Sequence, residues 1–160
     1  MFLCSTMKNK GFTVIEVIVV VAILTVLMVG ILVAVVPFGE SRSTQNDAKR
    51  LMAKLKLLQS RTTAVEIPSG CTGFGGYTIS FVDGEGTIDV TASCQAGSYS
   101  ESVEILKSSV FYNSPADLVI NSPDGTSNAL DIDICGGSTN YQITTTESGS
   151  ITGPVEIGAC

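Results

Sequence analysis

Glu16 is the residue of this sequence whose position most needs a chemical explanation. It stands directly before an apolar run, because every residue from Val17 to Val36 is apolar except Thr25 and Gly30. Burying a carboxylate in apolar surroundings is costly unless a positive group pairs with it. Glu16 is therefore a candidate functional residue that pairs with a cation. The alternative is that its side chain reaches the polar boundary of a membrane and has no specific partner.

The other chemically reactive side chains are five cysteines, and the sequence contains no histidine. Without histidine, Ser-His-Asp and Cys-His catalytic arrangements are excluded. The lack of histidine and of a C-x-x-C pair also argues against a zinc site. No carboxylate pair stands out among the acidic residues. We therefore expect no enzyme activity, no cofactor and no bound metal. The cysteines are Cys4, Cys71, Cys94, Cys135 and Cys160.

Four of these cysteines follow the apolar run, in a region rich in Gly, Ser and Thr, which favours disulfides and an oxidising compartment. Four cysteines allow three connectivities. We favour Cys71–Cys94 and Cys135–Cys160, because each pair joins sequence neighbours and the second ties down a C-terminal residue. The region from 67 to 160 is then expected outside the cytoplasm. The Lys and Arg residues after the apolar run would place it inside, but large domains translocate regardless of such charges.

The apolar run has the length of a membrane-spanning helix. At about 1.5 Å per residue it covers the ~30 Å hydrocarbon core of a bilayer. A single strand would leave its backbone groups unpaired in lipid, so we expect a transmembrane helix over residues 12–38. A secretory signal peptide would have a shorter apolar core and a small-residue cleavage site, and "LVAVVPFGES" offers none. A plain anchor fits the length but leaves Glu16 without a purpose.

The spacing of apolar residues over 39–66 predicts an amphipathic continuation of this helix, after an interruption at Pro37 and Gly39. Apolar residues recur there at three- and four-residue steps, which indicates one face of a helix. Leu57 lies nearly opposite this face, so we expect it to be exposed or used in a contact between subunits. The face consists of Ala48, Leu51, Met52, Leu55, Leu58, Thr62 and Val65.

The sequence pattern of residues 67–160 predicts a domain of antiparallel β-strands, called the head below. Short runs there alternate apolar and polar residues and are separated by turns of Gly, Asp, Asn and Ser. The helix face is the available cover for one side of the sheet. The expected fold class is α+β: a long N-terminal helix, its first half transmembrane, packed against a small antiparallel sheet. The expected strands are YTISFV, TIDVTA, VEILK, DLVI, ALDIDI and YQITTT.

The balance of acidic and basic residues differs between the helix, called the stem, and the head. Residues 67–160 carry eleven acidic residues and one base, Lys107, whereas residues 12–66 carry six bases and four acids. Nucleic-acid affinity comes largely from Lys and Arg, so no nucleic-acid partner is expected for the head. The basic stem and acidic head could aid lateral packing between copies. Equally, the acidity could serve only to keep an exported domain soluble.

The N-terminus as a whole resembles a known family. The stretch "KNKGFTVIEVIVVVAIL" is similar to the N-terminus of class-A type IV prepilins and type II secretion pseudopilins. The likeness consists of a short basic leader ending in Gly11, then Phe12, then Glu16 as the fifth mature residue. It implies a leader of residues 1–11, cleavage between Gly11 and Phe12 by a prepilin peptidase, and N-methylation of Phe12. It also implies that Glu16 pairs with the N-terminal amine of a neighbouring subunit.

The C-terminal part is similar to the end of H-type minor pseudopilins and their pilus counterparts, through "SPDG", "DIDIC" and "YQITTTESGSI". The calcium-binding loop of the major secretion pseudopilin has no recognisable equivalent. "DGEG" and the pair Asp131 and Asp133 contain possible calcium ligands, but hairpin turns and strand alternation explain them more simply.

These resemblances imply a minor pilin or pseudopilin, a structural subunit of a type IV pilus or a type II secretion pseudopilus. Its partners would be the prepilin peptidase, other pilin or pseudopilin subunits and the inner-membrane assembly machinery. It would cross the inner membrane once, with its head outside the cytoplasm, before entering a filament. The alternatives are a pilus-borne adhesin or ligand-binding subunit, and a membrane-anchored β domain unrelated to filaments.

Overall fold

The computed structural model describes residues 13–113 and 116–160, without the side chains of residues 29–38. Backbone contacts divide the chain into two units, residues 1–36 and residues 37–160. Three residues singled out from the sequence, Cys4, Gly11 and Phe12, lie outside the described residues.

The helix α1 extends over Val14–Thr63 and contributes to both units. It does not end at Pro37 or Gly39, although the sequence predicts an interruption there. Among the described residues, no helix has both the length and the apolar character needed to cross a membrane.

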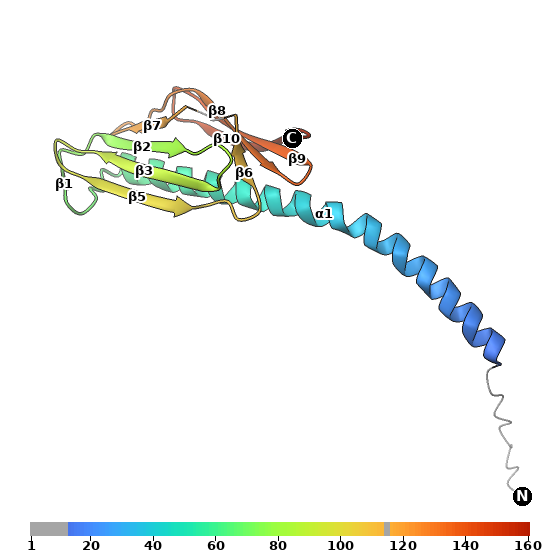
Figure 1. Cartoon of the computed structure of the whole chain (residues 1–160). Helices are drawn as coiled ribbons and strands as arrows, with labels where there is room; N and C mark the ends of the chain where they lie inside the picture. Colours follow the sequence, from blue (N-terminus) through green and yellow to red (C-terminus); the bar gives the residue numbers. More distant parts are fainter. Residues whose placement is uncertain (1–12, 114–115) are drawn as a thin grey trace, which may run out of the picture. The chain divides into compact units, whose positions relative to one another are not determined.

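The head contains two four-stranded antiparallel sheets where the sequence predicts one small sheet (Figure 1). One sheet has the order β5-β3-β2-β7, and the other has the order β10-β9-β8-β6. A short pair, β1 with β4, lies apart from both. The predicted α+β class is confirmed, but the head contains two four-stranded sheets instead of the one small sheet predicted. The strands are β1 Cys71–Thr72, β2 Gly76–Phe81, β3 Thr87–Ser93, β4 Ala96–Gly97, β5 Tyr99–Glu104, β6 Val110–Tyr112, β7 Leu118–Asn121, β8 Leu130–Gly136, β9 Thr139–Thr145 and β10 Ile151–Gly158.

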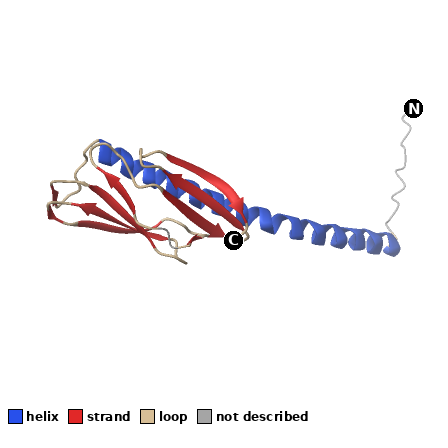
Figure 2. Cartoon of the chain, turned by 90° about the horizontal axis from the view of Figure 1, so that it is seen from above, coloured by secondary structure: helices blue, strands red, loops and turns tan. Residues whose placement is uncertain are grey.

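Both sheets pack on the part of α1 that lies in the unit of residues 37–160, as Figure 2 shows from above. The helix contributes Ala48, Leu51, Leu55 and Leu58, each at most 1% exposed. These are members of the face predicted from the sequence. Alternate residues of the strands complete the core, as in β3, where every second side chain is buried. Complete burial of a Leu, Ile or Phe side chain contributes about 1.5–3 kcal/mol, so this shared core is the main source of stability. The strand residues that are fully buried include Ile79, Ile88, Val90, Phe111, Leu118, Ile120, Ile132, Ile134 and Ile143.

Three polar side chains of α1 fasten loops of the head to the helix. Asp47 Oδ2 accepts hydrogen bonds from the Lys107 and Ser108 backbone N–H groups and from Ser109 Oγ, in the segment between β5 and β6. Thr44 donates to the carbonyl of Gly136, and Gln59 donates to the carbonyls of two turn glycines. These hydrogen bonds to a rigid element add to apolar contacts such as that of buried Leu106, which lies in the same segment between β5 and β6.

Helix α1 ends in a Schellman motif. The N–H of Glu66 donates to the carbonyl of Arg61, and the N–H of Val65 donates to the carbonyl of Thr62. Val65 occupies the left-handed position, with φ 52°, where glycine is usual. A β-branched residue is strained in that conformation. The helix face predicted from the sequence ends before this residue, because Val65 is 46% exposed.

We expect Val65→Gly to raise the free energy of unfolding by about 1 kcal/mol, since glycine relieves the left-handed strain. Urea unfolding of the full chain in detergent micelles, followed by near-ultraviolet circular dichroism, measures the change. Val119→Gly is the matched control, because Val119 is 39% exposed on strand β7, where glycine weakens a strand. Destabilisation by both substitutions would show that Val65 is not strained.

Candidate functional site

Thr13 and Glu16 form the N-terminal end of α1. The N–H of Glu16 donates to Thr13 Oγ1 at 3.3 Å, and the N–H of Thr13 donates to Glu16 Oε2 at 3.5 Å. This reciprocal pair is a capping box, which satisfies backbone donors that the first turn of a helix leaves unpaired. The carboxylate also lies at the positive end of the helix dipole. Glu16 therefore has a role within its own chain that is not among the expectations from the sequence, although the T-x-x-E spacing is a visible signal for it.

The helical surface after Glu16 is apolar on every side. Over residues 17–28 Thr25 is the one polar residue, and its hydroxyl donates to the carbonyl of Ala22 within the helix. The large apolar side chains of this stretch are between 49% and 74% exposed. A shallow apolar groove runs along it, lined by Val19, Ala22, Ile23, Val26 and Leu27. A helix of this kind requires apolar surroundings, either lipid or other helices.

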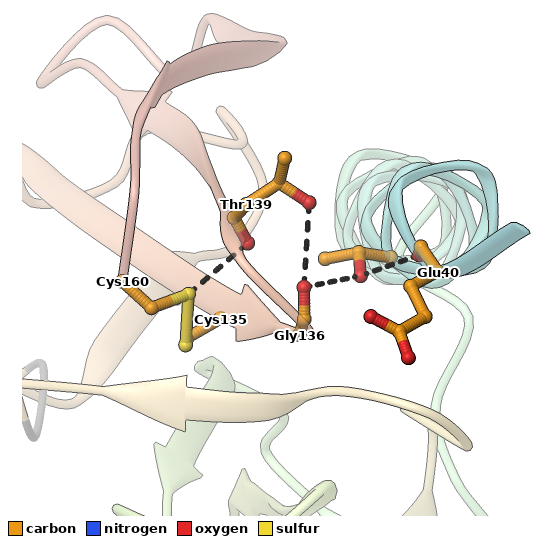
Figure 3. The surroundings of a disulfide bond; sticks show 6 residues. Glu40, Cys135, Gly136, Thr139 and Cys160 are labelled. Carbon is orange, nitrogen blue, oxygen red and sulfur yellow. Dashed lines mark hydrogen bonds between the residues drawn. A yellow bond between two sulfur atoms is a disulfide. The ribbon is translucent and has the colours of Figure 1, made fainter. Parts of the chain in front are cut away.

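The structure contains two disulfides, and they join the pairs that the sequence analysis favours. Cys71 is bonded to Cys94 with a Cα–Cα distance of 5.5 Å, and Cys135 to Cys160 with 5.7 Å. Both distances are usual for disulfides. The second bond attaches the end of the chain to β8 (Figure 3), with Cys160 Sγ 3.1 Å from the carbonyl oxygen of Thr139.

Figure 3 also shows how the end of β8, beside this disulfide, is held to α1. Thr44 Oγ1 lies 3.1 Å from Gly136 O and 3.0 Å from Glu40 O, so its one hydrogen is shared between the two carbonyls. Gly136 must be small, because an added Cβ would lie 2.4 Å from Thr44 Oγ1. The arrangement attaches the end of β8, which carries the C-terminal disulfide, to α1.

Two of the acidic residues considered as calcium ligands, Asp131 and Asp133, have other partners. Asp131 accepts a hydrogen bond from Thr144 Oγ1 at 2.7 Å, and Asp133 accepts one from Gln142 Nε2 at 3.0 Å. Both contacts link neighbouring strands β8 and β9. In the part of the chain that the structure describes, no three His, Cys, Asp or Glu side chains come together in a way that could hold a metal ion.

Comparison with known proteins identifies the N-terminal segment. No curated protein and no solved structure matches the chain. Residues 6–32 match the family model described as the prokaryotic N-terminal methylation motif. The matched segment contains Gly11, Phe12, the Thr13–Glu16 capping box and the apolar helical surface of residues 17–28. The motif implies processing by a prepilin peptidase and assembly with other pilins. The chain therefore carries the N-terminus of a type IV pilin-like prepilin.

Proposed function

We propose that this chain is a minor pilin or pseudopilin, a structural subunit of a type IV pilus or a type II secretion pseudopilus. The observation that carries the proposal is the methylation motif at residues 6–32, which includes the helical surface of residues 17–28 that is apolar on all sides. The same helix continues into the core of the head, where Leu51, Leu55 and Leu58 are buried. Helix α1 thus connects two parts with different proposed roles: the N-terminal segment, which would assemble with other subunits, and the head, which would be displayed.

The proposed maturation begins with cleavage of the Gly11–Phe12 bond. Glycine before the bond lets the backbone approach a peptidase groove closely, because it has no side chain. Removal of residues 1–11 exposes the amine of Phe12, which is then methylated. Cys4 leaves with the leader, so the mature chain keeps the four cysteines that form the two disulfides.

Assembly then proceeds through residues 12–38, which we propose lie in the inner membrane before incorporation. The carboxylate of Glu16 would pair with the amine of Phe12 of a neighbouring subunit, because opposite charges attract strongly in a low dielectric. In the isolated chain the same carboxylate accepts a hydrogen bond from Thr13. That bond is long, at 3.5 Å, so exchanging it for a charged partner loses little.

The two disulfides support a location of the head outside the cytoplasm, where such bonds persist. We propose that the head follows the pilin plan, with the amphipathic part of α1 covered by antiparallel sheets. A second candidate role, a ligand-binding subunit of the same filament, is favoured by one feature, a cleft beside the end of α1.

Replacing Gly11 by leucine is expected to leave the precursor uncut in the membrane, because the added side chain blocks the backbone from the peptidase. Immunoblotting of membranes from the native host separates precursor from mature chain. Gly39→Ala is the control, because an added Cβ at Gly39 meets nothing within 4 Å. Normal processing of Gly11→Leu would contradict the proposed cleavage site.

A further inference from the structure

A small cleft lies at the end of α1 that is embedded in the head. It has a volume of about 170 Å³ and is lined by Arg61 of α1, Tyr77 of β2, Tyr99 of β5 and the Glu66–Ser69 segment. Sites for drug-sized ligands have volumes of about 300–1,000 Å³. The cleft is therefore suited to a single side chain or a similarly small group.

Tyr77 supplies a hydrogen-bond donor that nothing in the described structure uses. The residue is 3% exposed, and its ring packs edge-on against Phe74 at 5.0 Å between centroids. Its hydroxyl lines the cleft and makes no hydrogen bond with a described residue. Tyr77 Oη is not among the buried polar atoms that lack a partner in the described structure, so the hydroxyl is open to the cleft and can donate to a ligand placed there. Burial raises the pKa of Tyr77 above 10.0, and the group stays protonated at neutral pH.

The neighbouring charges leave Arg61 as the cation available to a ligand. Glu101 already has two partners, Tyr99 Oη at 3.0 Å and Lys54 Nζ at 3.5 Å. Arg61 Nε lies 3.8 Å from Glu66 Oε2, and both side chains are well exposed, at 39% and 65%. A pair this long and exposed is worth at most about 1 kcal/mol. Glu66 therefore shows that a carboxylate reaches Arg61 and is held there weakly enough to be displaced.

Apolar side chains flank these donors. Ile67 is 52% exposed and lines the cleft beside Pro68. The strained Val65, on the other side of Glu66, is 46% exposed. Arginine binds carboxylates bidentately, and the exposed apolar rim suits the aliphatic part of a polypeptide next to an acidic side chain.

We propose that this cleft binds the carboxylate of an aspartate or glutamate side chain of a partner polypeptide. Arg61 forms the ion pair in place of Glu66, Tyr77 donates its hydroxyl hydrogen to the same carboxylate, and Ile67 contacts the flanking apolar residue. The site goes beyond the proposed structural role, because it gives the head a recognition function that does not depend on N-terminal processing.

The test is a titration of the full chain in detergent micelles, observed by NMR of ring-labelled tyrosines. The probe is a short blocked peptide with a central glutamate between isoleucines, compared with the same peptide carrying glutamine. We expect saturable shifts of the Tyr77 and Tyr99 signals with the glutamate peptide and binding weaker by about tenfold with the glutamine peptide. Acetate at the same concentrations is expected to bind more weakly than the glutamate peptide.

Arg61→Gln is expected to weaken binding of the glutamate peptide by about tenfold, read from the Tyr99 signals. Tyr77→Phe keeps the packing on Phe74 and should weaken binding severalfold. Arg42→Gln, an exposed arginine of the same helix, is the matched control and should bind as wild type. The proposal is overturned if the tyrosine signals do not move, or if both cleft variants bind as tightly as Arg42→Gln. Equal binding of acetate and the glutamate peptide would overturn the polypeptide as the source of the carboxylate.

Discussion

Asp47→Ala is expected to lower the free energy of unfolding by about 3 kcal/mol, because a buried carboxylate with several hydrogen-bonded partners is lost. Asp47 is 2% exposed and lies on the face of α1 toward the segment between β5 and β6. Its Oδ2 accepts hydrogen bonds of 2.9, 2.8 and 3.0 Å from Lys107 N, Ser108 N and Ser109 Oγ. Alanine leaves these three donors without their acceptor and opens the attachment of the loop to the helix.

Urea unfolding in detergent micelles, followed by near-ultraviolet circular dichroism, measures this loss. Asp131→Ala is the matched control, because Asp131 is an exposed carboxylate with one cross-strand hydrogen bond from Thr144. That change should cost about 1 kcal/mol or less. Asp47→Asn retains one oxygen acceptor and should fall between the two. Equal effects of Asp47→Ala and Asp131→Ala would show that the three contacts contribute nothing beyond a surface hydrogen bond.

Glu16→Gln and Glu16→Val are both expected to reduce incorporation into filaments by about tenfold or more, because each removes the charge that pairs with the amine of Phe12. The two variants separate the charge from the capping box. Glutamine still serves at the third position of a capping box, whereas valine does not. Loss of that cap costs about 1 kcal/mol at the helix end. Valine should insert into the membrane at least as well as glutamate, since it removes a charge from lipid.

The measurement is the ratio of the chain in sheared filaments to the chain in membranes, by immunoblot in the native host. Thr13→Ala is a further control, because it removes the Oγ1 acceptor of the cap and leaves the charge of Glu16 in place. Normal incorporation of Glu16→Gln with reduced incorporation of Glu16→Val would assign Glu16 to capping alone. Normal incorporation of both variants would remove any role in assembly.

The helical part of the fold could be predicted because its signal is local. Buried Ala48, Leu51, Leu55 and Leu58 follow the helical period, and these contacts repeat every three or four residues. Val65 fits the same period but is exposed, because the helix ends in a left-handed turn at this residue. That turn normally carries glycine, so a valine there gives no stop signal.

The sheets were predicted less well because their pairing is not local. Strand β6, residues Val110–Tyr112, pairs with β8 in the second sheet, although its neighbours in the sequence, β5 and β7, belong to the first. So short a strand has no alternation to detect. Strand β10 contains Gly153 and Pro154, which normally argue against a strand. It is an edge strand with an irregular register, where such residues are tolerated.

The functional residues also differ in whether the signal for them is local in the sequence. Gly11, Phe12 and Glu16 could be recognised because the motif is contiguous, and the family model matches the same stretch. The cleft of Arg61, Tyr77 and Tyr99 combines three elements far apart in the sequence. Tyr77 lies in the predicted strand YTISFV and is 3% exposed. Its unpaired hydroxyl becomes visible only in the folded chain.

The most direct test of the proposed function is the intact mass of the chain purified from membranes of the native host. The account predicts the mass of residues 12–160 with one added methyl group and with the hydrogens of two disulfides absent. Fragmentation should place the methyl group on the amine of Phe12. A chain that begins at Met1, or one cut after Val36, would contradict the proposal that this protein matures as a type IV pilin-like subunit.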